Sequence, residues 1–296
     1  MMMKSARLPV LFSLLSLACL CLSSPALPDL KKFIKASKLD DNQAPIHLNQ
    51  ILPSFDSPSA SNTLHSSRSI PSWDTTHLLA RRLLALSTTG TLATVFQNEH
   101  DHSSTAPSDL AGIPVSLPEY IADCANDDSS PLPELLGAGN PVILALHVST
   151  IVHNANAGSN ISLSIDWWHH DNHNRHGYRS EDNIEDPFAS QASLPRLSLI
   201  GTLEPLPDTM PDESRDPLEK CFLASHPDAV YWLPGNPRSP HRGYWARLVV
   251  QKALWIGGFG DRARIGWLDI DKWKAVRKSG KDGEKGWGDV RLPGEK

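Results

Sequence analysis

The chain has 296 residues, with 28 Lys and Arg against 33 Asp and Glu, and a formal net charge of −5. It contains no block of basic residues, and residues 83–174 include neither Lys nor Arg. Since proteins bind nucleic acids largely by neutralising phosphates with Lys and Arg, this composition argues against a nucleic-acid partner. The length allows one domain of generous size besides a leader and a spacer.

The first 26 residues have the layout of a secretory signal peptide. Lys4 and Arg7 precede an uncharged apolar run over 10–22, and Ser24 and Ala26 have the spacing that a signal peptidase recognises. The apolar run is shorter than the roughly 20 residues that a membrane-spanning helix needs, so an uncleaved anchor is only the alternative. We therefore expect a chain without a membrane span that is secreted or delivered to a vacuolar or endolysosomal lumen.

The remainder of the chain divides into three parts by composition. Residues 27–69 are rich in Ser, Asn, Asp and Pro and poor in large apolar side chains, which predicts a polar spacer or propeptide. Apolar periodicity is steady over 70–277, where we expect the folded domain. Residues 278–296 are rich in Gly and Lys and are expected to form a loose tail.

The folded domain is expected to begin with an amphipathic helix. Residues 78–86 place leucines on one face and arginines on another, and positions 74–76 supply candidate N-cap residues. β-branched residues then predict a strand over 91–96. Residues 115–124 fit either a strand or the start of a helix, and loops are expected over 98–109 and 126–140.

The middle of the chain predicts a β-hairpin. Residues 141–153 are dense in Val, Ile and Leu and indicate a long strand, and 154–159 indicate a turn. Over 161–167 apolar and polar residues alternate with period two, which is typical of a strand with one buried face.

The last third predicts further strands over 197–203, 244–250, 254–256 and 262–268, and helices over 212–225 and up to residue 276. The glycines at 257–260 suit a tight turn between the last two strands, because glycine adopts positive φ without strain. Many antiparallel strands with few helices predict a mainly β fold with peripheral helices, in which the sheet closes or nearly closes into a barrel.

One cluster of side chains has the chemistry of a metal site: His169, His170, Asp171, His173 and His176. Imidazole and carboxylate groups are ligands that Zn²⁺ or Cu²⁺ prefers. The spacing matches no helical metal motif, however, and the surroundings are polar. A solvated, His-rich loop is therefore the preferred interpretation, and metal binding by the four histidines is the alternative.

Two arginines just beyond the glycine turn, Arg262 and Arg264, are weak candidates for holding an anionic cofactor by charge-assisted hydrogen bonds. As alternate residues of a strand they are more often surface charges. The glycine spacing fits neither the Rossmann nor the Walker pattern. The sequence singles out no catalytic residue.

Two covalent features are expected in an oxidising compartment. Cys124 and Cys221 remain once the signal peptide is removed, and an even pair predicts one disulfide, with two free buried thiols as the alternative. Asn160 begins the one Asn-X-Ser/Thr sequon of the chain, at the tip of the expected hairpin, where an N-glycan is accessible.

The order of these segments resembles a known family. The similarity is carried by "LARRLLALSTTGTLATVF" at 79–96, "GIPVSLPEYIADC" at 112–124, "GNPVILALHVST" at 139–150, "LSLIGTLEPL" at 197–206, "FLASHPDAVYWLP" at 222–234 and "YWARLVVQKALWIGGFGDRARIGWL" at 244–268. In this order they resemble the CREG-type secreted β-barrel glycoproteins, a branch of the pyridoxamine 5′-phosphate oxidase-like superfamily, and favour a fungal-style member. The resemblance covers residues 72–275.

The resemblance implies a six-stranded antiparallel split β-barrel of the FMN-binding split-barrel type that forms a homodimer. In flavin-using relatives FMN lies at the dimer interface, and Arg and Lys of the early strands hold its phosphate, whereas CREG-type members are regarded as flavin-free. Because residues 83–174 lack Lys and Arg, we expect no cofactor. The first hypothesis is a non-enzymatic glycoprotein that recognises a protein or glycan partner through its surface. The alternative is an FMN-dependent oxidoreductase.

Overall fold

The structure is a computed structural model that describes residues 70–97, 107–126, 130–168, 191–280 and 283–295. The expected signal peptide and spacer, residues 1–69, lie outside the described residues. Among the helices of the described ranges, none combines the length and the hydropathy that crossing a membrane requires.

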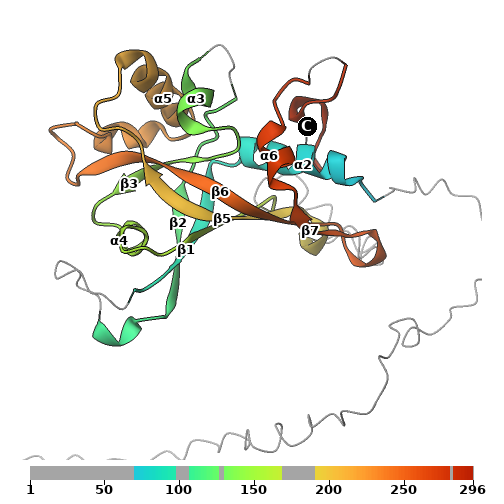
Figure 1. Ribbon diagram of the computed structural model, residues 1–296, viewed down its shortest axis with the longest axis horizontal. Helices are drawn as coiled ribbons and strands as arrows, with labels where there is room; N and C mark the ends of the chain where they lie inside the picture. Colours follow the sequence, from blue (N-terminus) through green and yellow to red (C-terminus); the bar gives the residue numbers. More distant parts are fainter. Residues whose placement is uncertain (1–69, 98–106, 127–129, 169–190, 281–282, 296) are drawn as a thin grey trace, which may run out of the picture. The chain divides into compact units, whose positions relative to one another are not determined.

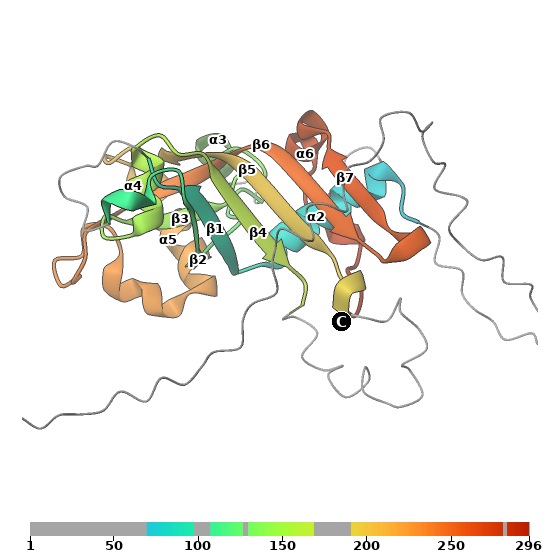
Figure 2. The ribbon, with the colours of Figure 1, turned by 90° about the horizontal axis from the view of Figure 1, so that it is seen from below.

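In the described part of the chain, seven strands form one antiparallel sheet: β1 (Thr89–Val95), β2 (Pro114–Tyr120), β3 (Val142–Leu146), β4 (Ile161–Asp166), β5 (Arg196–Pro205), β6 (Gly243–Gly257) and β7 (Arg264–Leu268). Six of them follow the order β2-β1-β4-β5-β6-β3, and β7 pairs with β6 outside this path (Figures 1 and 2). A bridge between Ala122 and Val142 links the chain just beyond β2 to β3. The two ends of the path therefore meet, which confirms the mainly β fold and the six-stranded antiparallel split barrel.

Strand β6 joins the two halves of the sheet because it is 15 residues long. One of its edges pairs with β5, and the other edge pairs first with β3 over 243–247 and then with β7 over 253–257. Between these two partners the backbone N–H of Val250 donates to Oδ1 of Asn140 over 3.0 Å. A side chain thus takes the place of a neighbouring strand, and this is where the sheet splits.

The helices lie at the periphery (Figure 1). The α-helices are α2 (Trp73–Leu86), α3 (Leu132–Leu136), α4 (Thr150–Asn156), α5 (Asp212–Ser225) and α6 (Ile270–Ala275). Short 3₁₀ helices of the described residues are η2 (Ser108–Leu110), η5 (Gln191–Ser193), η6 (Pro227–Trp232), η7 (Gly260–Arg262) and η8 (Trp287–Asp289).

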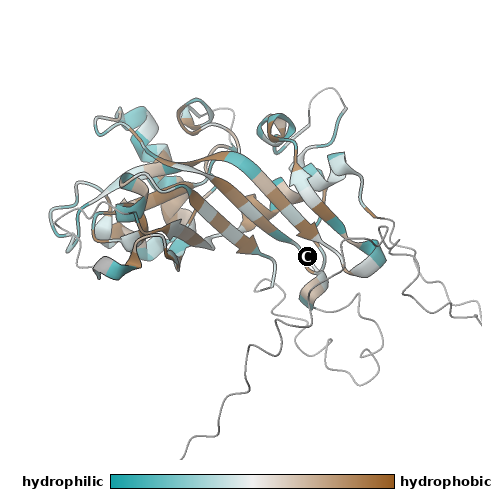
Figure 3. Cartoon of the chain, turned by 60° about the horizontal axis from the view of Figure 1, so that its bottom comes forward, coloured by the Kyte–Doolittle hydropathy of each residue, from teal (hydrophilic) through white to brown (hydrophobic). Residues whose placement is uncertain are grey.

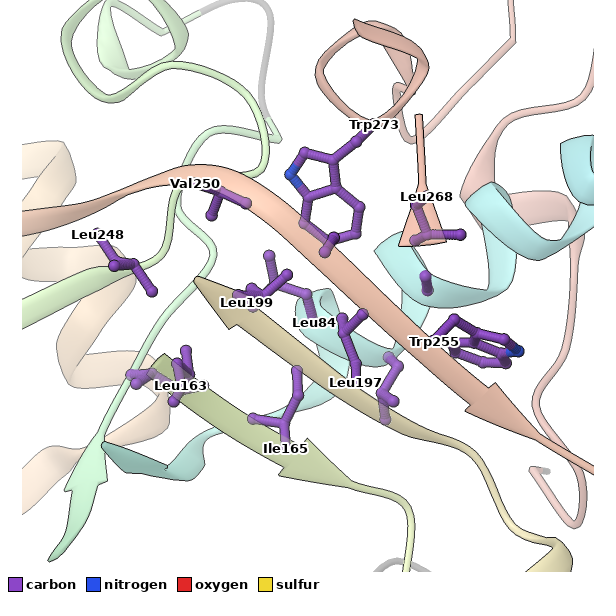
Figure 4. Packing of buried hydrophobic residues seen from close by; sticks show 14 of the residues in the cluster. Leu84, Leu163, Ile165, Leu197, Leu199, Leu248, Val250, Trp255, Leu268 and Trp273 are labelled. Atoms are coloured by element: carbon purple, nitrogen blue, oxygen red, sulfur yellow. The ribbon is translucent and has the colours of Figure 1, made fainter. Parts of the chain in front are cut away.

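The main hydrophobic core lies between the sheet and helices α2 and α6. Inward residues of β4 and β5, such as Leu163 and Leu199, face Leu84 of α2 and Trp273 of α6 (Figure 4). Leu163, Leu199 and Leu84 are fully buried. Burying a leucine side chain stabilises the fold by about 1.5–3 kcal/mol, so α2 and α6 stabilise the barrel by closing one side of its core.

A second core lies on the other side of β3. It unites Val142 and Leu144 of β3 with helices α3 and α5. Cys124 and Cys221 form a disulfide across this cluster, with Cα atoms 5.9 Å apart. The pairing predicted from the cysteine count is therefore present, and it ties the segment after β2 to α5.

The prediction of a β-hairpin over 141–167 is wrong. Strand β3 ends at Leu146, and the following residues form helix α4, in which Ile151 and Val152 are buried. β3 pairs with β6, whereas β4 pairs with β1 and β5. Strand β3 and helix α4 both contain buried Val, Ile and Leu residues, so the apolar run extends across the two elements. Hydrophobicity alone therefore does not mark the boundary between the strand and the helix.

Other boundaries also differ from expectation. Helix α2 begins at Trp73, with Ser72 as N-cap accepting from the Thr75 N–H over 3.1 Å, rather than near residue 78. The expected loop over 126–140 contains α3, and residues 244–256 form one strand instead of two. The segment 115–124 resolves in favour of a strand, β2.

The C-terminal segment was expected to be a loose tail, but residues 283–295 pack against the domain. Leu292 is only 2% exposed within the main core, and Trp287 is 7% exposed. Arg82 of α2 donates from Nε to Oε2 of Glu295 over 2.6 Å, and a second, shorter contact joins the same two side chains. The indole N–H of Trp167 donates to the carbonyl of Pro293 over 2.7 Å.

Candidate functional site

The candidate ligand surface of the sheet is its outer face, which is turned away from the main hydrophobic core. In a strand successive side chains alternate between faces, and directly paired residues share a face. Opposite the core, pairing brings together a set of side chains that we call the outer face: Thr91, Ala93, Ser162, Ser164, Asp166, Arg196, Ser198, Ile200, Thr202, Glu204, Arg247, Val249, Lys252, Leu254, Ile256, Ile265 and Trp267. Figure 3 shows apolar and polar residues alternating along the strands.

At one end of the outer face, the part that β6 and β7 form is apolar. Ile265 and Trp267 of β7 are 60% and 58% exposed, and they pair with Ile256 and Leu254 of β6. The middle carries small side chains with hydroxyl groups, and the hydroxyls of Ser162 and Ser198 lie 3.0 Å apart. An exposed tryptophan beside exposed isoleucine is unusual for a surface that remains in water.

Four cations occur on the described strands: Arg196, Arg247, Lys252 and Arg264. Arg247 donates to Glu204 over 3.1 Å and to the Leu135 carbonyl over 2.7 Å. Arg264 donates to the Pro71 carbonyl over 2.9 Å and lies over the Trp73 ring at 5.0 Å.

Arg196 and Lys252 differ in their surroundings. Arg196 lies over the Trp168 ring at 5.6 Å and donates to the Ala192 carbonyl over 3.4 Å. Lys252 is exposed and makes no hydrogen bond or ion pair within the described ranges. Among the cations on the described strands, Lys252 is therefore the one whose charged group has no partner within the described residues.

This arrangement does not fit the phosphate of FMN. A phosphate ester with close to two negative charges needs several charge-assisted hydrogen bonds, each contributing about 1.5–3 kcal/mol. Strands β1, β2, β3 and β4 carry no cation. A phosphate on the outer face would find Lys252 and a few hydroxyl groups, and the remaining strand cations would have to leave their present partners.

The two arginines predicted as weak anion ligands lie at the end of η7 and at the start of β7. The turn between β6 and β7 has the expected glycines at positive φ, 82° at Gly258 and 58° at Gly260. Arg262, in η7, is exposed and has an interaction of its own. Arg264 is turned toward the start of α2, where it bonds Pro71.

The other predicted site residues are the four histidines and Asn160. His169, His170, His173 and His176 lie outside the described residues. Within the described ranges, no group of three or more His, Cys, Asp or Glu side chains has the geometry of a metal site. Asn160 is exposed, but it lies between α4 and β4 rather than at a hairpin tip.

Lys252 was missed from the sequence because it lies beside a β-bulge. Lys252 pairs with Ile200 and Val250 pairs with Gly201, so Gln251 is an extra residue on β6. The bulge interrupts the period-two pattern there. The sequence signal of the bulge is a shift in the apolar period: Leu248 and Val250 face inward before Gln251, and Ala253 and Trp255 face inward after it.

Comparison with known proteins adds a family and a set of similar folds. The sequence model of the family described as "CREG, beta-barrel" matches residues 71–275. A search of curated protein sequences finds no match.

Three solved structures illustrate the similar folds. A heme binding protein from Mycobacterium smegmatis has 18% identity and a TM-score of 0.40, over 68% of this chain and 61% of that chain, less than two thirds of its length. A protein of the pyridoxinephosphate oxidase family from Clostridium acetobutylicum has 13% identity and a TM-score of 0.36, over 68% and 98%. A pyridoxamine 5′-phosphate oxidase-related, FMN binding protein from Nostoc punctiforme has 12% identity and a TM-score of 0.36, over 65% and 86%.

Proposed function

The chain belongs to the CREG β-barrel family, and on that premise we propose that it is a flavin-free binding protein of the secretory pathway. It would act by surface recognition of a protein or glycan, outside the cell or in a vacuolar or endolysosomal lumen. An FMN-dependent oxidoreductase of the pyridoxamine 5′-phosphate oxidase type is the alternative that the fold allows.

The observation that carries the flavin-free proposal is the state of the strand cations. Arg247 and Arg264 each satisfy two partners inside the protein, and Lys252 alone of the described strand cations has none. Releasing a buried or half-buried arginine to bind phosphate would leave its carbonyl or carboxylate partner unpaired, at a cost of about 1–3 kcal/mol. The free energy lost by releasing these arginines would therefore cancel most of the free energy that they could contribute by binding the phosphate.

The visible absorption spectrum of the purified protein tests this proposal. We expect a colourless protein without the absorption bands of oxidised flavin, and no flavin in the supernatant after heat denaturation. Stoichiometric FMN released by denaturation would contradict the proposal and favour the oxidoreductase.

We also propose that the apolar end of the outer face is covered by a second copy of the chain. Exposed Ile265 and Trp267 next to Leu254 and Ile256 form the kind of apolar patch that proteins bury on association. Trp267→Glu should convert a dimer to a monomer in sedimentation analysis. A monomeric wild-type protein at micromolar concentration would contradict this part of the proposal.

Secretion is supported by the N-terminal layout and by the disulfide between Cys124 and Cys221. Exposure of Asn160 gives an oligosaccharide access to the sequon. We expect the mature chain to begin near residue 27, with further trimming up to about residue 69. N-terminal sequencing tests the cleavage, and a shift in gel mobility after glycosidase treatment, absent in Asn160→Gln, tests the glycan.

A further inference from the structure

A polar groove lies at the start of β6, away from the turn between β6 and β7. It has a volume of about 760 Å³, and its polar lining includes His147, Asn156, Asp208, His241, Arg242 and Tyr244. Pockets of about 300–1,000 Å³ hold small organic molecules. The groove is thus large enough for a ligand well beyond a single inorganic ion.

Pairing of β3 with β6 builds the floor of the groove. The His147 N–H donates to the Arg242 carbonyl over 3.0 Å, which continues the ladder one residue beyond the end of β3. The rings of His147 and Tyr244 lie 5.2 Å apart, and the Tyr244 hydroxyl donates to Oδ1 of Asn156 over 3.2 Å. This bond orients the amide so that Nδ2 of Asn156 remains to donate to a ligand.

One wall of the groove is a loop fixed by its own hydrogen bonds. Nδ2 of Asn236 donates to the carbonyls of Val230 and Tyr231 over 3.1 and 3.3 Å, while its Oδ1 accepts from the Arg238 N–H over 2.9 Å. Prolines at 234, 237 and 240 restrict the backbone further. The wall is preformed, so little ordering entropy opposes ligand binding.

The charge of the groove differs from that of the whole chain. The chain carries a formal charge of −5, but the groove is lined by Arg242, two imidazoles and a single carboxylate, Asp208. Within the described ranges the side chains of Arg242 and His241 have no hydrogen bond or ion pair, and both residues are exposed. A guanidinium without a partner suits a phosphate, which it binds with two parallel hydrogen bonds.

We propose that this groove binds a sugar phosphate. Arg242 and His241 hold the phosphate, and Tyr244, His147 and the Asn156 amide contact the hydroxylated ring. The groove does not include the outer face on which the flavin question depends, so this inference goes beyond the proposed function. FMN binding on the outer face and sugar phosphate binding in the groove can each fail without affecting the other.

Calorimetric titration of the full secreted protein with glucose 6-phosphate, inorganic phosphate and glucose tests the inference. We expect saturable binding of glucose 6-phosphate, about ten-fold or more tighter than either fragment, because both halves of the groove are then used. Arg242→Gln should weaken glucose 6-phosphate at least ten-fold. Asn156→Ala should weaken glucose 6-phosphate but leave inorganic phosphate unchanged.

Arg238→Gln is the matched control, since Arg238 belongs to the same loop but lines a second, smaller hollow with Tyr231 and not the groove. It should leave binding unchanged. The inference is wrong if glucose 6-phosphate does not saturate, if inorganic phosphate binds equally well, or if Arg238→Gln weakens binding as much as Arg242→Gln. Unchanged thermal unfolding of the Arg242→Gln protein separates lost binding from lost folding.

Discussion

Removing the disulfide between Cys124 and Cys221 should cost several kilocalories per mole of stability. The bond joins positions 97 residues apart, so in the unfolded chain it closes a long loop. The chain-entropy model gives about 4–5 kcal/mol for a loop of this length. Cys124 is also 4% exposed within the second core, so its replacement by alanine removes packed sulfur as well as the cross-link.

Urea unfolding of wild type, the two single Cys→Ala variants and the double variant measures this effect. Either single variant already breaks the bond, so all three should lose a similar amount, about 3–5 kcal/mol. Wild type measured in reductant should lose nearly as much, because it lacks the bond but keeps both sulfur atoms. A loss below about 1 kcal/mol in the double variant would contradict the reasoning, because the bond would then constrain neither the unfolded chain nor the packing of α5.

Three further substitutions probe other parts of the fold. Burial opposes ionisation of Glu295, but hydrogen bonds from Arg82 and the Leu292 N–H hold its pKa below the ordinary value. The ion pair therefore stabilises the fold above the carboxyl's ordinary pKa, and this stabilisation is lost as the pH falls through the lowered pKa. Glu295→Gln should accordingly flatten the acid limb of a plot of unfolding free energy against pH. Asp269→Ala removes the N-cap that accepts from two N–H groups of α6, over 2.9 and 3.0 Å, and should lower stability by about 1 kcal/mol in thermal unfolding. Gly201→Ala would place a Cβ 1.8 Å from a backbone oxygen of β6 and should cost about 1–3 kcal/mol or prevent folding, as judged by yield and circular dichroism.

The alternation of apolar and polar residues predicted the strands that have one buried face. Over β4, burial alternates as the sequence pattern requires, with Ile161, Leu163 and Ile165 inward. The same reasoning was wrong at β3, since Val142 faces the second core and Ile143 the main core. A strand buried on both faces has no polar alternation, and the helix after it continues the apolar run.

Residues that meet only through topology could not be predicted. His147, Asn156, Asp208 and Arg242 lie in four separate segments, and only the antiparallel pairing of β3 with β6 and the return of the chain after β5 bring them to one groove. Each is an ordinary polar residue in its own sequence context. The docked C-terminus was missed for a related reason, because Trp287 and Leu292 are isolated apolar anchors in a segment dominated by Gly and charged residues.

The most direct test of the account is a titration of FMN with the purified protein, followed by the fluorescence of the flavin. Binding at micromolar concentration needs about −8 kcal/mol, and the outer face offers only Lys252 as an uncommitted strand cation of the described residues. We predict no saturable quenching at micromolar protein, and the same result for Lys252→Ala. Saturable quenching that is lost in Lys252→Ala, or in a variant with both Arg262 and Arg264 changed to alanine, would contradict the account and make the chain a flavoprotein.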